Sequence, residues 1–215
     1  RIDALSLRRE IECGSTVGRL SPDCVRLTEN MPVTDFAPLE DGLCFVQDES
    51  SAYAASLLDA RPGMTVCDVC ACPGGKSFSA ALSMKNEGVI YSFDLHENKL
   101  SLIENGAKKL GIDIIKTEAR DAREPSEVLF SRADRVLCDV PCSGLGIIRK
   151  KPEIRFKNPD EIRTLPEIQA RILANCAQYV KKGGTLVYST CTILQRENED
   201  VVRAFLTENP EFEAV

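Results

Sequence analysis

Tryptophan is absent from the 215 residues of this sequence, and histidine occurs once, at His96. A single histidine two residues after Asp94 does not favour histidine acid–base catalysis, and we expect His96 to be a surface residue that opens a helix. The sequence also lacks an apolar run near the roughly 20 residues that a membrane helix needs, and no signal peptide opens it. We therefore expect a cytoplasmic protein without a membrane partner.

Cysteine is abundant, with ten residues, but the patterns of a disulfide scaffold and of a zinc site are both missing. In a large, core-forming chain without a signal peptide, reduced thiols are expected rather than disulfides. Cys67, Cys70 and Cys72 crowd together, yet the second Cys-x-x-Cys pair that a structural zinc site requires is absent. The prediction is free thiols and no metal.

Positive charge is scarce, since the formal net charge is −6. An acidic chain is a poor general match for nucleic acid, because phosphate binding rests on lysine and arginine. A local basic stripe could still bind a phosphate backbone, although a solvated charged loop would explain the same charges. This basic stripe consists of Arg149, Lys150, Lys151, Arg155 and Lys157.

Strands and helices are predicted to alternate from residue 64 onward. β-branched runs predict strands at 64–70, 88–94, 112–119, 135–140 and 185–190. Amphipathic stretches predict helices at 74–84, 96–111, 166–184 and 196–209. The alternation predicts an α/β fold, with a doubly wound, mostly parallel sheet and helices on both faces. Ligands of such sheets bind outside the carboxyl ends of the strands.

The two ends of the chain depart from this alternation. Residues 1–46 contain short strand candidates, turn residues and no long helix, which predicts a small N-terminal α+β appendage to a main domain at 47–215. The chain starts without methionine, and PEFEAV (210–215) resembles the start of a further strand. We therefore expect an excised fragment whose last strands are truncated.

The residues after the first strands predict a nucleoside ligand. In DVCACPGGKS (68–77), a glycine pair lies between a strand and a helix, where backbone amides can face a ligand. The spacing matches neither the dinucleotide motif nor the phosphate loop. Asp94 stands where such folds bind ribose, and it could also cap the following helix. With Asp121 and Asp139 after later strands, these acids predict a nucleoside-bearing ligand without a phosphate chain.

Two cysteines follow the next two strands. VLCDVPCSGLGIIRKKPEIR (136–155) contains Cys142 just beyond a hydrophobic run, and YSTCT (188–192) contains Cys191. Because these strands are neighbours in the usual parallel order, the two thiols should emerge side by side at the ligand edge. A single buried cysteine is usually structural, whereas two thiols that converge on one pocket favour covalent catalysis.

These motifs resemble those of the S-adenosylmethionine-dependent RNA 5-methylcytosine methyltransferases. The resemblance rests on Asp139-Val-Pro-Cys142-Ser-Gly, Ser189-Thr-Cys191, the glycine loop and QDESS (47–51), and it covers nearly the whole chain. GIIRKKPEIR and LVYSTCTILQRENE are most similar to members that modify small-subunit ribosomal RNA. The resemblance implies a Rossmann-like class I methyltransferase fold, an S-adenosylmethionine cofactor, an RNA partner, a catalytic domain at 47–215 and part of an RNA-binding subdomain at 1–46.

The resemblance also implies a role for each site residue. Cys191 would be the nucleophile, and Cys142 would help to release the product. Asp139 would lie between the cofactor and the target base, while Asp94 would bind the ribose hydroxyls and Asp121 the adenine. The loop that cradles the methionine part of the cofactor would consist of Cys70, Ala71, Cys72, Pro73, Gly74, Gly75 and Lys76.

The chemistry of cytosine explains why two thiols are useful. Carbon 5 is a poor nucleophile until a thiolate adds at carbon 6, and a base must later remove the carbon 5 proton so that the thiol can leave. A thiol with a pKa of about 8.5 is mostly protonated at neutral pH, so we expect the site to lower this pKa, with Lys76 as the candidate cation. Gly144 and Gly146 would let the loop move around a flipped nucleotide, and the basic stripe would hold the RNA backbone.

Several alternatives stay open. The first alternative is a transfer RNA or large-subunit ribosomal RNA enzyme of the same family, because no motif encodes the target cytosine. DNA cytosine methyltransferases share the pattern but use the Pro-Cys thiol, so only the resemblance assigns Cys191 as the nucleophile. A catalytically silent RNA-binding protein would not need both cysteines. Cys72 and Thr192 replace the family's usual alanine and serine, which should leave the site intact. We expect a monomer.

Overall fold

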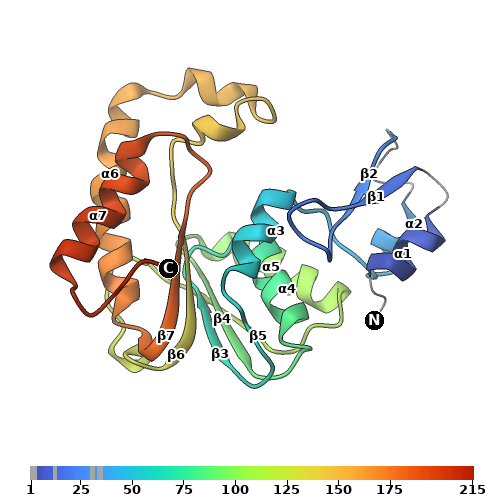
Figure 1. The fold of residues 1–215 in the computed structure, drawn as a ribbon, viewed down its shortest axis with the longest axis horizontal. Coiled ribbons are helices and arrows are strands. Elements are labelled where there is room, and N and C mark those ends of the chain that lie inside the picture. Colours follow the sequence, from blue (N-terminus) through green and yellow to red (C-terminus); the bar gives the residue numbers. More distant parts are fainter. Residues whose placement is uncertain (1–3, 12–13, 30–31, 33–35) are drawn as a thin grey trace.

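A five-stranded parallel sheet forms the centre of the protein (Figure 1). The computed structural model describes residues 4–11, 14–29, 32 and 36–215. The strand order is β5-β4-β3-β6-β7, and each neighbouring pair is parallel. The strands are β3 (Thr65–Asp68), β4 (Val89–Asp94), β5 (Ile115–Ala119), β6 (Ala133–Asp139) and β7 (Val180–Ser189). The predicted α/β fold with a parallel sheet is therefore confirmed.

Helices cover both faces of the sheet, as predicted. α4 (Gly75–Ser83) and α5 (Glu97–Lys109) pack on one face, while α6 (Pro159–Ala177) and α7 (Glu199–Glu208) pack on the other (Figure 1). β6 shows why, because Leu137 joins the core under α4 and α5 whereas Val136 and Cys138 join the core under α6. All three are fully buried. This near-continuous apolar run is the signature of a parallel strand that is covered on both sides.

The helix before β7 differs from the prediction. α6 begins at Pro159 rather than at residue 166, because the Asn158 side chain caps it by accepting a hydrogen bond from the Asp160 amide. Pro166 lies inside this helix and does not begin it. The helix ends at Ala177, and residues 181–184 belong to β7 at an irregular register against β6. The lysines and glycines predicted to end the helix thus open the strand.

Residues 210–215, which resemble the start of a further strand, form no strand in this structure, and the truncation of the last strands stays a prediction. α7 ends at Glu208, before this segment. The ring of Phe212 instead packs edge-on against Phe205 of α7, with 5.2 Å between the ring centroids. The segment thus follows its own helix, and it has no strand partner with which to exchange the hydrogen bonds that define a ladder.

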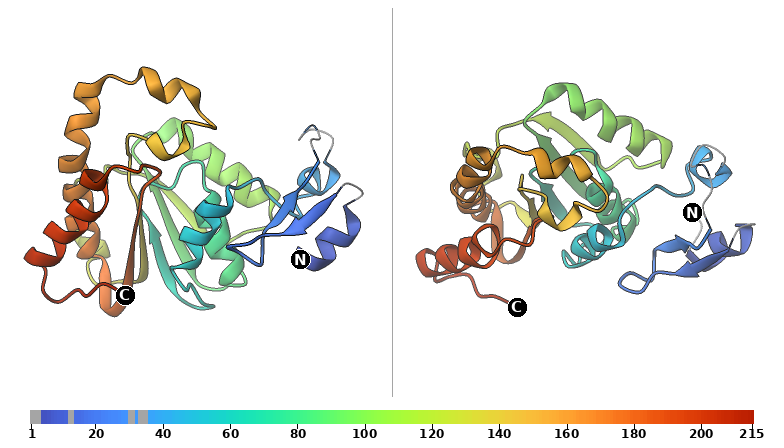
Figure 2. Two further views of the ribbon diagram at one scale, coloured as in Figure 1. Left: turned by 45° about the horizontal axis from the view of Figure 1, so that its top comes forward. Right: turned by 90° about the horizontal axis from the view of Figure 1, so that it is seen from above.

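The N-terminal residues form a separate small α+β unit beside the sheet (Figure 2). The antiparallel pair β1 (Ser15–Val17) and β2 (Val25–Leu27) lies between α1 (Ala4–Glu10) and α2 (Ala37–Glu40), as predicted. α3 (Glu49–Ser56) then leads into the main sheet and packs against α4. Glu49 ties the two parts together, because its Oε1 accepts a hydrogen bond from the Leu20 amide at 2.6 Å.

Candidate active site

The two predicted thiols meet at the carboxyl edge of the sheet. Cys142 follows β6 and Cys191 follows β7, and these strands pair along their length. Their sulfur atoms lie 3.1 Å apart, within the distance of an S–H···S contact and too far for a disulfide. The Cys191 amide also donates to the Cys142 sulfur at 3.2 Å. The convergence predicted from strand order is confirmed.

Glycines hold the two cysteine loops together. The Gly146 amide donates to the Cys191 carbonyl at 3.0 Å, and a Cβ on Gly146 would lie 2.9 Å from that same oxygen. Gly144 has a φ of +78°, which a residue with a side chain rarely adopts. A hydrogen bond of 2.6 Å between the Ser143 and Thr192 hydroxyls also links the two loops. Both glycines therefore have a packing role, and the loop motion predicted for them stays a prediction.

The environment separates the pKa values of the two thiols. The Cys142 thiol donates to the Cys191 sulfur and thereby lowers the pKa of Cys191 to about 7, against the opposing effects of burial and of the Asp139 charge. The same contact and burial raise the pKa of Cys142. Lys157 also lowers the pKa of Cys191. At neutral pH a large share of Cys191 is therefore thiolate, the form that acts as nucleophile.

The cation that favours this thiolate is Lys157, the last residue of the basic stripe. Its Nζ donates to the carbonyls of Cys142 at 3.3 Å and Ser143 at 3.0 Å, which fixes it over the Cys142 loop. Lys76, the cation proposed from the sequence, has a different partner. Its Nζ lies 2.5 Å from Asp139 Oδ2 in a half-buried ion pair. Lys157, and not Lys76, is the lysine whose charge lowers the pKa of Cys191, and a catalytic role for Lys76 stays a prediction.

Asp139 is held from two sides at the end of β6. Lys76 binds one carboxylate oxygen, and the Ser189 hydroxyl of β7 donates to the other at 2.5 Å. Side-chain exposure of 28% leaves part of the carboxylate open to a ligand. Because Lys76 follows directly on the glycine loop, this pair joins the cofactor loop to the strand that carries Cys142. Asp139 thus lies between the two halves of the candidate site.

A buried glutamate and glutamine support the Cys142 loop, and sequence reasoning missed both. Glu197 and Gln169 are completely buried. Glu197 Oε2 accepts from the Ser143 amide at 2.8 Å and from Gln169 Nε2 at 3.0 Å. Gln169 Nε2 also donates to the Pro141 carbonyl at 3.0 Å. The backbone on either side of Cys142 is therefore hydrogen-bonded to side chains of α6 and of the short 3₁₀ helix η5 (Gln195–Glu197).

Asp94 connects the end of β4 to the glycine loop. Its carboxylate accepts from the His96 amide at 3.0 Å and from the Cys72 amide at 3.4 Å. The second bond reaches across to the loop between β3 and α4, so Asp94 and the loop form one wall of the site. His96 is the N-cap residue of α5, and its side chain makes no cap hydrogen bond. Asp94 therefore shapes the turn before α5 as well as the loop.

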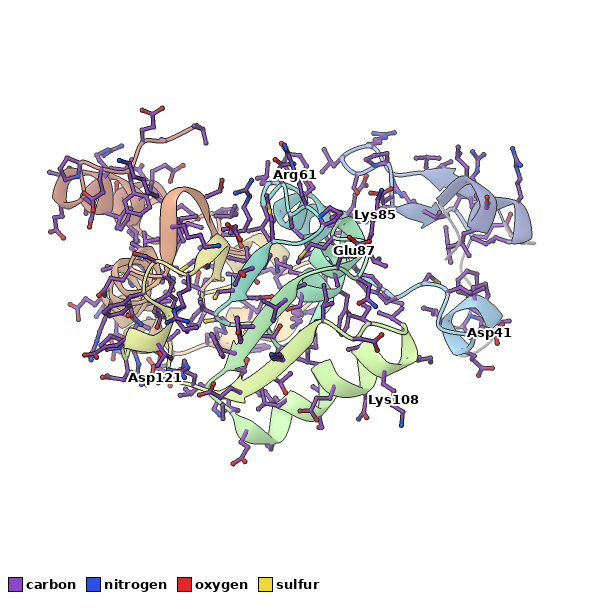
Figure 3. The ribbon with its side chains drawn as sticks, turned by 90° about the horizontal axis from the view of Figure 1, so that it is seen from below. Asp41, Arg61, Lys85, Glu87, Lys108 and Asp121 are labelled. Carbon is purple, nitrogen blue, oxygen red and sulfur yellow. The ribbon has the colours of Figure 1, made fainter. Side chains whose placement is uncertain are left out.

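A cavity of about 210 Å³ lies between the ends of β3, β5 and β6. Its lining is mostly apolar and includes Cys70, Ala122 and Pro141, with Asp121 among the lining residues. Asp121 lies at the end of β5, on the side of the molecule away from the N-terminal elements (Figure 3). Its ion pair with Arg123 at 2.6 Å lowers the pKa of Asp121. Arg120 and Arg123 also line the cavity, and Arg123 donates to both carboxylate oxygens of Asp121. A slot with this apolar floor suits a flat base.

Two unpaired polar atoms beside the glycine loop suit the amino-acid end of a ligand. Asp68 Oδ1, at the end of β3, is buried and has no hydrogen-bond partner among the described residues, and burial raises the pKa of Asp68 to about 7. Gln47 Nε2 is also buried and finds no partner in the described part of the chain, and a Cβ added at Gly75 would lie 3.3 Å from it. An acceptor and a donor left open here fit an ammonium and a carboxylate. The residues present therefore fit S-adenosylmethionine.

A larger hollow of about 520 Å³ contains none of the predicted site residues. Its lining includes Thr65 and Lys181, which lie at the amino-terminal ends of β3 and β7. Parallel sheets bind ligands at the carboxyl ends of their strands, where the two thiols, the acids and the glycine loop converge. The smaller cavity beside those groups is therefore the candidate cofactor pocket.

The basic stripe lies on the surface above the carboxyl edge of the sheet. In Figure 1 this golden segment rises over the top of the strands, and it contains the 3₁₀ helices η3 (Leu145–Ile147) and η4 (Pro152–Phe156). All its basic side chains are exposed. Lys150 forms an ion pair with Asp48 at the start of α3. RNA binding by Arg149, Lys150, Lys151 and Arg155 stays a prediction.

The described part of the chain contains neither a metal-binding cluster nor a membrane-spanning helix. No group of three or more histidine, cysteine, aspartate or glutamate side chains is arranged to hold a metal ion there. No helix among the same residues combines the length and the hydropathy that crossing a bilayer requires.

Comparison with known proteins identifies the family. Residues 55–215 match the model of the 16S rRNA methyltransferase RsmB/F family. The probable ribosomal RNA small subunit methyltransferase B of Bacillus subtilis is 47% identical over 91% of this chain, which covers 44% of that relative. The chain thus spans less than half the length of this curated relative.

Solved structures agree with this match. A methyltransferase homologue from Pyrococcus horikoshii has a TM-score of 0.80 at 32% identity, over 94% of this chain and 64% of its own. NSun6 from the same organism, solved with the S-adenosylmethionine analogue SFG, has a TM-score of 0.77 at 28% identity, over 86% of this chain and 48% of its own. The Rossmann-like methyltransferase fold and the S-adenosylmethionine cofactor are confirmed, and the chain belongs to the 16S rRNA methyltransferase RsmB/F family.

Proposed function

We propose that this chain transfers a methyl group from S-adenosylmethionine to carbon 5 of a cytosine in RNA, through a covalent bond between Cys191 and the base. The observation that carries the proposal is the pair of thiols 3.1 Å apart, one of which has its pKa lowered to about 7. A nucleophilic thiol beside a second thiol suits a reaction that must first add to a pyrimidine ring and later release it.

The first step uses the Cys191 thiolate. Its sulfur forms a bond to carbon 6 of cytosine, and the electron pair of the double bond between carbons 5 and 6 becomes available at carbon 5. Asp139 would hydrogen-bond the base during this addition, and the partial exposure of its carboxylate at the end of β6 supports this role. S-adenosylmethionine, when bound, supplies the electrophilic methyl group that carbon 5 accepts.

The second step releases the product. Carbon 5 then carries both the new methyl group and its original proton, and that proton must be removed before the ring can regain its double bond. Once the Cys191 sulfur is bonded to carbon 6, the contact that chiefly raises the pKa of Cys142 is lost, so Cys142 can give its own proton to solvent and accept the carbon 5 proton. The electron pair of the broken C–H bond restores the double bond, the bond between sulfur and carbon 6 breaks, and the thiolate returns to Cys191.

Small-subunit ribosomal RNA is the substrate we propose. The name of the Bacillus subtilis relative refers to that RNA, and its identity to this chain is high at 47%. The chain covers 44% of that relative, so selection of one cytosine can also depend on parts of the longer protein. The exposed basic stripe beside Cys142 provides charge for the phosphate backbone within this chain.

The test is methyl transfer followed by nucleoside analysis. The protein is incubated with isotopically labelled S-adenosylmethionine and unmodified small-subunit ribosomal RNA, and the RNA is digested to nucleosides for mass spectrometry. We expect label in 5-methylcytidine. Cys24→Ala is the matched control, because Cys24 lies in the N-terminal unit away from the site, and it should retain full transfer. Label in another nucleoside, or in a protein residue alone, would contradict the proposal.

A further inference from the structure

The most exposed aromatic ring of the described residues belongs to Phe156, in the segment that follows the Cys142 loop. Phe156 exposes 82% of its surface, whereas Tyr53, the next most exposed ring, exposes 44%. Aromatic side chains are scarce in this chain, at 6% of its residues, and most of them lie in the core. A large apolar ring that stays in water forgoes the free energy that its burial would provide.

The backbone that carries Phe156 is fixed on both sides of the ring. Two residues earlier, Ile154 is buried, and a Cβ on Gly144 would meet its side chain at 2.9 Å. One residue later, Lys157 Nζ donates to the Cys142 and Ser143 carbonyls. The ring thus stands on a rigid support and keeps its exposure although its neighbours are anchored. A pre-formed platform of this kind binds with little loss of conformational entropy.

The anchors also fix where the ring lies. Lys157 donates a hydrogen bond to the carbonyl of Cys142 itself. Ile154 packs against Gly144, and a Cβ added at Gly144 would lie 3.9 Å from the Cys191 sulfur. Phe156 therefore belongs to the rim of the two-thiol site. A nucleotide next to a base bound over the thiols would therefore have the exposed ring of Phe156 within reach at this rim.

The charges around the ring select the kind of partner. Arg155 and Lys157 flank Phe156 in sequence, and Lys150 and Lys151 precede it in the same exposed segment. Apolar protein interfaces are depleted of lysine at their centre, whereas single-stranded RNA is bound by aromatic rings interleaved with cations that contact phosphates. An aromatic ring between cations matches the second pattern.

We propose that Phe156 is a stacking platform for an unpaired nucleobase of the RNA, at the rim of the two-thiol site. This inference rests on the proposed function in that it takes RNA as the substrate. Stacking uses the face of a base, which every base has, so Phe156 would raise affinity and orient the strand without selecting a sequence.

The absence of tryptophan allows a direct test. Phe156→Trp introduces the only tryptophan of the chain, and its fluorescence reports whether a base stacks on it. We expect strong quenching when a short single-stranded RNA containing cytosine is added. Leu102→Trp is the matched control, because Leu102 is also exposed, at 54%, but lies on α5 and outside the segment that carries Phe156. Its fluorescence should change little.

A second variant measures the contribution to binding. We expect Phe156→Ala to weaken RNA affinity by roughly 10-fold, equivalent to about 1.4 kcal/mol, and Phe156→Tyr to restore most of it. Binding of S-adenosylmethionine by calorimetry should stay unchanged in both, which separates lost stacking from misfolding. Unchanged RNA affinity in Phe156→Ala, together with an unquenched tryptophan at that position, would overturn the proposal.

The failure of this inference can be told apart from failure of the proposed function. Quenching and restored affinity without any methyl transfer would contradict the proposed function and leave the platform supported. Methyl transfer to RNA by a protein whose tryptophan at position 156 is not quenched would contradict the platform alone. A wild-type protein that does not bind RNA would overturn both.

Discussion

The candidate site has two parts that are built in different ways. The cofactor half consists of the loop 68–77, Asp94 and Asp121, and the thiol half consists of Cys142, Cys191 and the residues that support their loops. In the cofactor half, short local segments carry the groups that matter, such as the loop 68–77 and Asp94 at the end of β4. In the thiol half, Cys142 and Cys191 depend on residues far along the chain, and Glu197 reaches Ser143 across 54 positions. The first half follows from local motifs, and the second exists only once the fold has formed.

The largest expected effect separates the halves completely. Cys191→Ser replaces the thiolate by a hydroxyl that stays protonated at neutral pH, so methyl transfer to RNA should fall by a factor of about 1,000 or more. Binding of S-adenosylmethionine, measured by calorimetry, should stay within about twofold of wild type. Loss of cofactor binding in this variant would show that the two halves are coupled and would undermine the comparison.

A smaller but still large effect is expected at the buried support of the thiol half. Glu197→Ala removes the acceptor of two hydrogen bonds and leaves the Ser143 amide unsatisfied, which should lower the free energy of unfolding by about 2–3 kcal/mol. Misplacement of Cys142 should also reduce methyl transfer. Chemical denaturation and initial rates measure the two effects.

The conservative change Glu197→Gln gives the sharper version of this test. It keeps an oxygen acceptor for the Ser143 amide and should recover most of the stability. Glu199→Ala is the control, because Glu199 is exposed at the start of α7, and it should change neither quantity by much. Equal stability of Glu197→Ala and Glu199→Ala would show that the buried network does not support the loop.

A substitution in the cofactor half should lower cofactor affinity and leave the reactivity of the thiols unchanged. Asp121→Asn removes the negative charge at the rim of the apolar cavity, and we expect affinity for S-adenosylmethionine to fall roughly 10-fold, since hydrogen bonds to a charged group contribute about 1.5–3 kcal/mol. The alkylation rate of Cys191 should stay unchanged. Wild-type cofactor affinity in this variant would remove Asp121 from the pocket.

The smallest expected effect is a shift in pH dependence within the thiol half. Cys142→Ala removes the S–H donor that is the main cause of the lowered pKa of Cys191, so that pKa should rise from about 7. The thiolate fraction grows as pH rises, so the midpoint of Cys191 alkylation by iodoacetamide should move to higher pH. Mass spectrometry of the Cys191 peptide measures it. An unchanged or lower midpoint would contradict the hydrogen bond.

The sequence alone predicts the features that depend on local patterns, and it misses those that depend on contacts between distant residues. The parallel sheet and the meeting of Cys142 with Cys191 were predictable, because strand alternation and strand order require only local patterns and a general topological rule. Glu197 gave no signal of this kind. In QRENED it lies among polar and charged neighbours, and only the fold shows that it is completely buried beneath the Cys142 loop.

The sequence also did not predict which residues the lysines of the site contact. Lys76 adjoins the glycine loop and was a reasonable candidate for the cation near the thiolate, but Asp139 binds it instead. Lys157 takes that position because the segment after Cys142 folds back and brings its Nζ to the loop. The Pro166 error had a similar cause, since a proline typical of a helix start lies within α6 while the Asn158 cap sets the true start.

The central claim is that Cys191 attacks the base and Cys142 releases it, and one gel tests it. Cys142→Ala and Cys191→Ala are each incubated with S-adenosylmethionine and unmodified small-subunit ribosomal RNA, then separated under denaturing conditions that preserve only covalent bonds. We predict that Cys142→Ala accumulates a protein–RNA adduct, because the thioether forms but cannot be eliminated, and that Cys191→Ala forms none. An adduct in Cys191→Ala and none in Cys142→Ala would contradict the assignment and make Cys142 the nucleophile.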